Sequence, residues 1–425
     1  MTTPARRKRI ITCQGTIQLV TALSVVAYRA ETEKSALDTF DNYLVIYGLY
    51  APAQQINDFI SLIQKIANSL ASWKSIAYIS PDQLTAIADK LDDTSEASIF
   101  RIVYNLVGTD EAAEIYLCRN WQFGNQLLIN AYRKAQKICY GDSIGIYFSA
   151  NSSAFFMAQS PPKISFKKSL VHTFVTAPKQ KLKGQINRIQ SWLGIKTILK
   201  AVEFDQGYFT LPDIMGEEPF MEYKKISSSY ILDAVTSLTD LVNTDYVVCL
   251  HKKIGDAPVA VLLTSNFSEA SRMVYDDELT AYLRFLKAAN LASGTVLLIK
   301  PHPRDDLKKI QQLQERLSDF FADVIVLAEP ELFFLPFEIF FKRVFFCSEP
   351  LLNDNVRSVQ VFAVSSACLG LKLLFDVPST IGFGPAITSN LFYKGYVDGR
   401  LAHEHDLSAA IQAIEARPAA VAALP

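Results

Sequence analysis

The sequence predicts an α/β protein of two domains, each built around its own parallel β-sheet, with a cleft between them. Three observations support this prediction. A chain of 425 residues is longer than one hydrophobic core usually organises. Apolar runs such as residues 295–299 do not alternate with polar residues, which is typical of strands buried on both faces. Such runs alternate with stretches of helical spacing along most of the chain.

Strands of the first domain are predicted at residues 9–13, 43–47, 75–79, 113–117, 138–140 and 198–204, and helices at 17–28, 56–70, 81–91, 99–107 and 124–137. A turn at Gln14-Gly15-Thr16 joins the first strand to the first helix, as at the start of a doubly wound domain. Its glycine would let a ligand approach the helix amino terminus, although a plain tight turn is equally consistent. The basic stretch 163–183 shows no clear pattern.

The second domain is predicted to begin after a connection rich in Gly, Pro and Ser, which divides the chain into residues 1–225 and 226–425. Strands are predicted at residues 246–250, 259–263, 295–299, 324–327, 344–347 and 359–364. Helices are predicted at residues 278–289 and 307–320, and further helices begin near Pro336 and Ser365.

Composition indicates a folded chain with little overall charge. Half of the residues are hydrophobic, a fifth are charged and the net charge is −1, which excludes a disordered chain and supports no nucleic-acid partner. The six cysteines have neither metal-ligand nor redox spacing, so we expect buried reduced thiols. No apolar run approaches the ~20 residues that span a bilayer. We therefore expect a cytoplasmic protein, and no feature indicates an oligomeric state.

The strongest charge run is Arg6-Arg7-Lys8-Arg9, directly before Ile10-Ile11. It is a candidate for peripheral contact with anionic lipid of the inner membrane or with a polyanionic acceptor. A solvated amino-terminal tail is the more common structure for such a run. The segment that follows does not match a secretory signal, because Gln14-Gly15 interrupts it early.

Two candidate sites lie in the second domain at a strand end and at a helix start. Lys300-Pro301-His302-Pro303 follows the strand 295–299, and a histidine that can be charged at neutral pH suits stabilising or protonating a leaving phosphate. The alternative is a solvated basic turn. Ser365-Ser366 offers hydroxyls and free N–H groups at a helix amino terminus, where a serine N-cap is the alternative.

Two further candidates are carboxylates. Glu338 follows Pro336 at the start of a helix and could accept hydrogen bonds from a ribose diol, or simply offset the helix dipole. Asp142 lies in the turn Gly141-Asp142-Ser143-Ile144-Gly145 and could act as a general base. An ordinary turn aspartate is the alternative.

The order of these motifs resembles the bacterial sialyltransferase and polysialyltransferase families. The chain has an acidic-glycine turn, then Lys-Pro-His-Pro, then Pro-x-Glu, then Ser-Ser before a helix, and residues 113–147 and 297–305 also resemble those families. The resemblance implies the two-domain GT-B fold and transfer of sialic acid, or a related nonulosonic acid, from a CMP-activated donor. The acceptor would be a glycan hydroxyl, as in the synthesis of polysialic acid, capsule or lipooligosaccharide.

The resemblance also implies a role for each candidate residue. His302 would contact the donor phosphate and assist departure of CMP. The remaining donor contacts would come from Ser365 and Ser366 on the phosphate, Lys300 and Pro301 along the cytidine, and Glu338 on the ribose. Asp142 in the acceptor-binding first domain would deprotonate the acceptor, with direct displacement and inversion at the anomeric carbon.

The chain departs from the family pattern at the base. Those families have two acidic residues before a glycine, whereas here Asp142 alone is acidic. Asp205, in Glu203-Phe204-Asp205-Gln206-Gly207, is a competing candidate that comes late in the first domain. Because a CMP-sugar carries one phosphate, we expect no metal and no other cofactor. The alternatives are a transferase that uses CMP-Kdo or a UDP-sugar, and a non-catalytic GT-B-like protein that binds a nucleotide or glycan.

Overall fold

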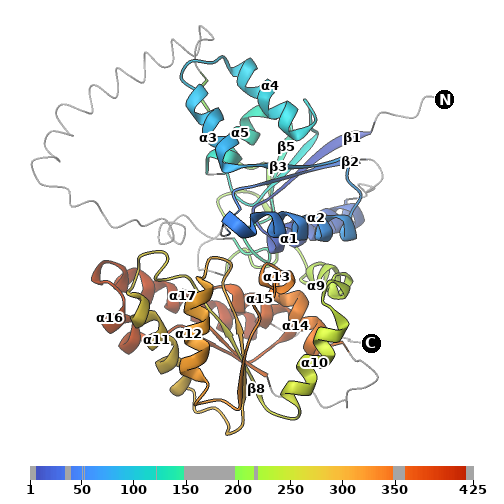
Figure 1. The fold of residues 1–425 in the computed structure, drawn as a ribbon. Helices are drawn as coiled ribbons and strands as arrows, with labels where there is room; N and C mark the ends of the chain where they lie inside the picture. The colour runs from blue at the N-terminus through green and yellow to red at the C-terminus, as the bar shows by residue number, and fades with distance from the viewer. Residues whose placement is uncertain are drawn as a thin grey trace, which may run out of the picture.

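The computed structural model describes residues 6–33, 40–49, 51, 53–120, 122–147, 197–214, 219–347 and 359–417; the basic stretch 163–183 lies outside them. The chain forms two α/β halves, each around its own parallel sheet (Figure 1). The named strands of the first sheet end at Lys225 and those of the second begin at Val259. That the domain boundary falls between residues 225 and 226 stays a prediction.

The first sheet has the strand order β3-β2-β1-β4-β5-β6-β7, so the chain changes direction across the sheet between β1 and β4. Its strands are β1 (Arg7–Cys13), β2 (Phe40–Tyr47), β3 (Ser75–Ile79), β4 (Glu114–Leu117), β5 (Gln136–Cys139), β6 (Gln206–Phe209) and β7 (Tyr223–Lys225). The helices that accompany them are α1 (Thr16–Thr32), α2 (Ile56–Leu70), α3 (Pro81–Lys90), α4 (Glu96–Val107) and α5 (Phe123–Ala131).

The second sheet has the order β10-β9-β8-β11-β12, with the change of direction between β8 and β11. Its strands are β8 (Val259–Leu263), β9 (Val296–Lys300), β10 (Asp323–Val326), β11 (Val359–Ala363) and β12 (Ser379–Ile381). Its helices are α9 (Ser229–Ser237), α10 (Thr244–Ile254), α11 (Tyr275–Lys287), α12 (Leu307–Leu317), α13 (Pro330–Phe333), α14 (Phe337–Phe345), α15 (Ala367–Phe375), α16 (Pro385–Leu391) and α17 (Val397–Glu415). Two parallel-sheet α/β halves of this kind form the GT-B fold.

Several predicted elements are wrong. Residues 246–250 lie in α10, because Asn243 caps that helix through the N–H of Tyr246 and the buried side chains recur at helical spacing. Residues 344–347 complete and follow α14. The segment 198–204 has no regular structure, since the strand that pairs with β5 starts at Gln206. The helix predicted at 124–137 ends at Ala131, because β5 pairs with β4 from Gln136.

The basic run at the amino terminus is part of the first sheet and not a solvated tail. Arg9 is buried in β1 and pairs with Glu114 at 3.0 Å. Lys8 lies 3.1 Å from Glu111. These carboxylates neutralise the charges of Arg9 and Lys8, and contact of the basic run with lipid stays a prediction. Within the described part of the chain, no helix combines the length and apolarity needed to cross a bilayer.

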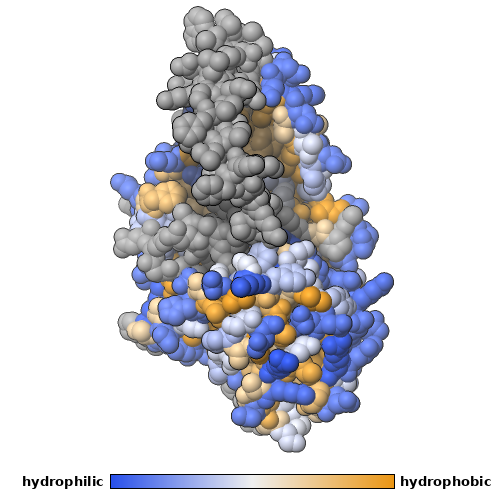
Figure 2. All heavy atoms as spheres, turned by 90° about the vertical axis from the view of Figure 1, so that its left-hand side faces the viewer, coloured by the Kyte–Doolittle hydropathy of each residue, from blue (hydrophilic) through white to orange (hydrophobic). Residues whose placement is uncertain are grey.

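The two halves pack through a shared hydrophobic cluster that includes side chains of α1, α9, α14 and both sheets. The hydroxyl of Ser24 on α1 donates to the carbonyl of Tyr230 on α9 at 3.1 Å. Phe59 on α2 stacks on Phe334, with ring centroids 4.4 Å apart. These contacts hold the carboxyl ends of the two sheets toward each other. The face of the second half that Figure 2 turns to the viewer differs from this interface, because its hydrophobic residues are scattered among hydrophilic ones.

Candidate active site

His302 lies in the loop directly after β9, where its backbone is held by two neighbours. Its N–H donates to Asp305 Oδ2 at 2.8 Å and to Thr264 Oγ1 at 3.0 Å. The Nδ1 atom of its ring accepts the N–H of Arg304 at 3.1 Å. Because Nδ1 is an acceptor, the neutral ring carries its proton on Nε2. His302 therefore presents an N–H donor to a ligand.

The surroundings of His302 shift its pKa. Burial, with the nearby charges of Arg304, Lys309 and Lys300, lowers its pKa to about 3. The free protein consequently holds a neutral imidazole at pH 7. An anionic phosphate beside the ring would favour the protonated form, since an opposite charge stabilises it. The imidazole thus suits a role as hydrogen-bond donor that gains a proton only as negative charge develops.

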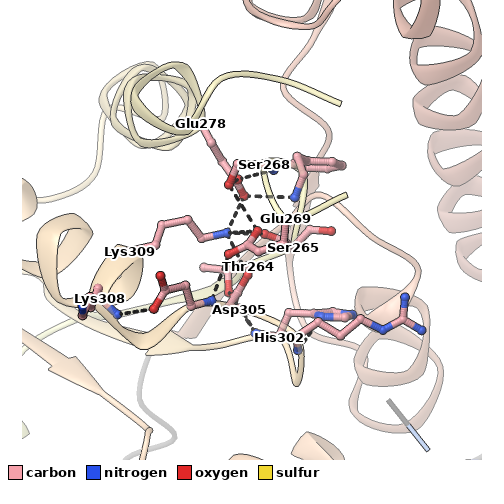
Figure 3. A network of polar contacts seen from close by, with 12 residues as sticks. Thr264, Ser265, Ser268, Glu269, Glu278, His302, Asp305, Lys308 and Lys309 are labelled. Atoms are coloured by element: carbon pink, nitrogen blue, oxygen red, sulfur yellow. Dashed lines mark hydrogen bonds and ion pairs between the residues drawn. The ribbon is translucent and has the colours of Figure 1, made fainter. Parts of the chain in front are cut away.

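A buried group of charges supports the His302 loop (Figure 3). The ammonium of Lys309 lies 2.9 Å from carboxylate oxygens of Asp305, Glu269 and Glu278. Within the described residues, these three carboxylates are close enough together to hold a metal ion, but the ammonium lies among them. The spacing of Asp305 and Lys309 by four residues in a helix start was readable in the sequence. Their pairing with Glu278 was not.

Lys300 ends β9 with its side chain buried. Its Nζ donates to the carbonyl of Leu332 at 3.0 Å and to that of Phe333. Burial lowers its pKa to about 7. The ammonium therefore holds α13 against the end of the second sheet. Contact of Lys300, or of the adjacent buried Pro301, with cytidine stays a prediction.

Glu338 lies in the first turn of α14, as predicted, and it is buried. Burial raises its pKa to about 7, opposed by Lys300. Gly370 of α15 lies against it, since a methyl group at that position would come within 2.6 Å of Glu338 Oε1 and overlap Ile144. Ile144 belongs to the acidic-glycine turn of the first half. That turn is thus in contact with the helix that follows Ser365-Ser366.

Ser365 and Ser366 follow β11 and open α15. Ser366 occupies the N-cap position, but its side chain makes no capping hydrogen bond. Neither hydroxyl is hydrogen-bonded to another residue of the described ranges, and both residues are partly exposed. The two hydroxyls at the amino terminus of α15 are consequently available to bind an anion.

Asp142 lies just beyond β5, in a turn that Gly141 makes possible with a φ of 87°. Its Oδ1 accepts the side-chain N–H of Gln18 at 3.0 Å and pairs with Arg119. The side chain is 30% exposed, and burial raises its pKa while Arg119 opposes the rise. Thr16, on the same helix as Gln18, donates to the carbonyl of Phe334 at 2.8 Å. Sequence reasoning missed Gln18 and Arg119.

Asp205 has a different position from Asp142. It precedes β6, and its Oδ2 accepts the N–H of Lys137 in β5 at 2.7 Å. Because β5 and β6 are parallel, Asp205 lies at the amino end of these strands, whereas Asp142 lies beyond the carboxyl end. The structure therefore brings the Asp142 turn, and not Asp205, to the second half.

Comparisons with known proteins identify the family of the chain. A family model described as alpha-2,8-polysialyltransferase matches residues 10–343. No curated protein matches the chain. The structure is similar to UDP-GlcNAc 2-epimerase from Neisseria meningitidis bound to UDP-GlcNAc, with 10% identity, coverage of 96% of this chain and 98% of that chain, and a TM-score of 0.45. It is also similar to the UDP-GlcNAc 2-epimerase of Methanocaldococcus jannaschii (10% identity, 93% and 97% covered, TM-score 0.43).

A third similar structure is ADP-heptose lps heptosyltransferase II of E. coli, at 10% identity, with 96% of this chain and 100% of that chain covered and a TM-score of 0.36. The family match spans most of the chain and includes the turn of Asp142, the loop of His302 and the start of α14. The sequence resemblance drawn from these motifs is thereby confirmed. The chain belongs to the alpha-2,8-polysialyltransferase family and is a sialyltransferase-like glycosyltransferase that uses a nucleotide-sugar donor and a glycan acceptor.

Proposed function

We propose that the protein transfers sialic acid, or a related nonulosonic acid, from a CMP-activated donor to a hydroxyl of a glycan at the cytoplasmic side of the membrane. The observation that carries this proposal is the contact of Ile144 with α15 at Gly370. It brings the turn of a candidate base against the helix whose open amino terminus suits a phosphate. Family membership supports sialyl transfer as the reaction.

The donor would bind to the second half. Its phosphate accepts hydrogen bonds from the hydroxyls of Ser365 and Ser366 and from the first N–H groups of α15. The Nε2–H of His302 donates to a leaving phosphate oxygen. Glu338 accepts hydrogen bonds from the ribose diol, and the cytidine lies along Lys300 and Pro301. The neutral state of His302 supports this arrangement, because a neutral donor stabilises negative charge that develops in the transition state.

The acceptor would approach from the first half. Asp142 takes the proton of the acceptor hydroxyl as its oxygen attacks the anomeric carbon of the donor sugar. The bond from that carbon to the phosphate oxygen of CMP breaks, and CMP leaves with the bonding electron pair. Attack and departure on opposite faces invert the configuration. The pKa of Asp142, which burial raises, supports its role, because a stronger base removes the proton more readily.

We propose that this reaction needs no metal ion. A CMP-sugar has one phosphate to neutralise, and the hydroxyls, the helix amino terminus and the imidazole can stabilise its charge. Transfer activity should then persist in the presence of a chelator. Loss of activity with EDTA and recovery with a divalent cation would contradict the proposal.

Thermal-shift titration with CMP, UMP and UDP tests the donor assignment. A ligand at a hundred times its dissociation constant stabilises the folded state by about 2.7 kcal/mol, so CMP should raise the melting temperature clearly more than UMP or UDP. The double variant Ser365→Ala/Ser366→Ala should lose most of the CMP effect. Ser408→Ala on α17, whose hydroxyl bonds only within its own helix, is the matched control. A preference for UDP would indicate that the donor is a UDP-sugar. Transfer from CMP-Kdo but not from CMP-sialic acid would indicate that the transferred sugar is Kdo.

A further inference from the structure

One carboxylate, that of Asp305, contacts both the backbone of His302 and Thr264, the other residue that accepts the N–H of His302. Asp305 accepts the N–H of His302 at 2.8 Å, and it also accepts the hydroxyl of Thr264 from the loop after β8. The other oxygen of Asp305 lies 2.9 Å from the ammonium of Lys309. Asp305 therefore links the His302 loop directly to Lys309.

Lys309 is held by oxygen atoms from three parts of the second half (Figure 3). Besides Asp305, its Nζ donates to Glu278 on α11 at 2.9 Å, and to Glu269 at 2.9 Å and the carbonyl of Ser265 at 3.1 Å in the loop after β8. Glu278 in turn accepts the N–H and the hydroxyl of Ser268, at 2.8 Å and 2.6 Å. One ammonium thus joins α11, the loop after β8 and the loop after β9.

The electrostatics make this ammonium indispensable to the arrangement. The side chains of Lys309, Glu278 and Asp305 are 0% exposed. The two buried carboxylates, Glu278 and Asp305, already outnumber the one cation, whereas Glu269 reaches solvent. A buried charge that loses its partner is strongly unfavourable. Without the ammonium, Glu278 or Asp305 would have to take up a proton or move toward solvent. Asp305 can do neither without weakening its hydrogen bonds to His302 and Thr264.

We propose that Lys309 is a positioning residue for His302, and that its ammonium fixes the two loops as a bound metal ion would in such a cluster of carboxylates. Lys309 acts through Asp305 on the backbone of His302 and so on the direction of the imidazole. The inference rests on the proposed role of His302 for its effect on transfer. Its effect on the imidazole itself does not depend on which donor is used.

The test compares Lys309→Met with Lys308→Met in the full-length protein. Lys308 precedes Lys309 on α12 but is exposed, so both variants lose one positive charge from the same helix turn. Nitrogen NMR of histidine-labelled protein reports the tautomer and titration of His302, whose signal is assigned with His302→Gln. In the wild type and Lys308→Met, the ring should remain the neutral Nε2–H form well below pH 6. In Lys309→Met it should titrate at a higher pH than in the wild type, with both tautomers populated, because one nearby cation is lost and the loop that buries the ring is released.

Transfer provides the second readout. Misplacement of a catalytic group by about 1 Å can cost ~100-fold, so kcat of Lys309→Met should fall by roughly that factor, whereas Lys308→Met should stay within about twofold of the wild type. Asp305→Asn leaves one acceptor oxygen, which cannot bind both the N–H of His302 and the ammonium of Lys309, so the substitution breaks the link between the two residues. It serves if Lys309→Met does not fold. It should change the His302 signal in the same way, and Lys309→Met should add little to it in the double variant.

Two outcomes would overturn the inference. The first is a folded Lys309→Met protein whose His302 signal titrates as in the wild type. The second is an Asp305→Asn protein with an unchanged His302 signal. If the His302 signal changes as expected while no protein transfers sugar from a CMP donor, the positioning role stands and the proposed function fails.

Discussion

The loops that carry the two candidate catalytic residues are built differently. The His302 loop is anchored by Asp305 to a buried cluster of charges in which Lys309 is central. The Asp142 turn is shaped by Gly141 and Gly145, which have φ values of 87° and 62°, and is held by backbone hydrogen bonds and one partly exposed ion pair. The His302 loop is thus fixed mainly by charge, and the Asp142 turn mainly by backbone conformation.

The surroundings of His302 and Asp142 also shift the pKa of the two side chains in opposite directions. Burial, together with the cations Arg304, Lys309 and Lys300, lowers the pKa of His302 and leaves a neutral ring. Asp142 has one cation beside it, and burial raises its pKa. The difference supports the proposal that the second half binds the phosphate, because a neutral N–H donor remains there. It also supports the proposal that the first half removes the proton, because a carboxylate there is made more basic.

Substitution of His302 should have the largest effect and should affect every reaction of the donor. In His302→Ala, transfer and donor hydrolysis should both fall by about 10²–10⁴-fold, because the departing phosphate loses its donor whichever acceptor attacks. Release of CMP from CMP-sialic acid, measured with and without a glycan acceptor, checks this. His405→Ala is the matched control, since that side chain is 85% exposed. Equal activity of the two variants would remove His302 from the mechanism.

Substitution of Asp142 should distinguish the role of the first half from that of the second. Asp142→Asn should reduce transfer about 100-fold or more, while CMP binding remains close to that of the wild type and donor hydrolysis falls less than transfer. Asp205→Asn, at the other edge of the sheet, should leave transfer unchanged. If Asp142→Asn keeps full transfer and Asp205→Asn loses it, the base has been assigned to the wrong turn.

How much could be predicted from the sequence depended on whether a feature is decided within one segment or by contacts between distant segments. Residues 56–70, 75–79 and 259–263 form elements with the predicted bounds, since their burial pattern is continuous or periodic within one segment. The run 246–250 was misread because its apolar residues also fit a strand, whereas the cap at Asn243 makes it helical. Local pattern was sufficient wherever one segment decides its own structure.

The site follows the same rule. His302 and Asp142 were identified because each follows an apolar strand, which is a local signal. Glu278 pairs with Lys309 across 31 residues, and Gln18 bonds to Asp142 across 124 residues. No pattern within either segment indicates these partners, because the fold creates them. The lowered pKa of His302 could not be predicted for the same reason, since its burial and its cationic neighbours come from the folded chain.

The pH dependence of folding stability tests the electrostatics around Glu338 in the second half. Its pKa in the folded protein is raised to about 7 from 4.5, so its contribution to stability is present below about pH 4.5 and is lost as the pH rises toward 7. Relative to the wild type, Glu338→Gln should therefore gain stability between pH 4.5 and 8, by about 3 kcal/mol. Denaturant unfolding of both proteins at the two pH values measures this gain. The exposed Glu331→Gln is the control for loss of a carboxylate, and an equal difference at both pH values would contradict the prediction.

Gly370→Ala should have the smallest effect on stability. It acts where α15 of the second half contacts the Asp142 turn of the first half. Alanine is favoured over glycine within a helix by about 1 kcal/mol, yet its methyl group would overlap Ile144 and approach Glu338 Oε1 to 2.6 Å. Because such overpacking costs about 1–3 kcal/mol, we expect a net loss of stability of about 1 kcal/mol. Transfer should fall further than CMP binding, since the Asp142 turn must withdraw from α15.

Replacement of Ile144 distinguishes this overlap from any other effect of the alanine. Ile144→Ala alone removes the contact and should weaken transfer, but in the double variant it should relieve the overlap and recover stability. The coupling energy of the two substitutions, measured by unfolding, should be about 0.5–3 kcal/mol. If Gly370→Ala instead raises the melting temperature and leaves transfer intact, the helix propensity prevails and the turn can move without cost. The position of Asp142 would then not depend on its contact with α15, and the backbone of the turn alone would have to set it.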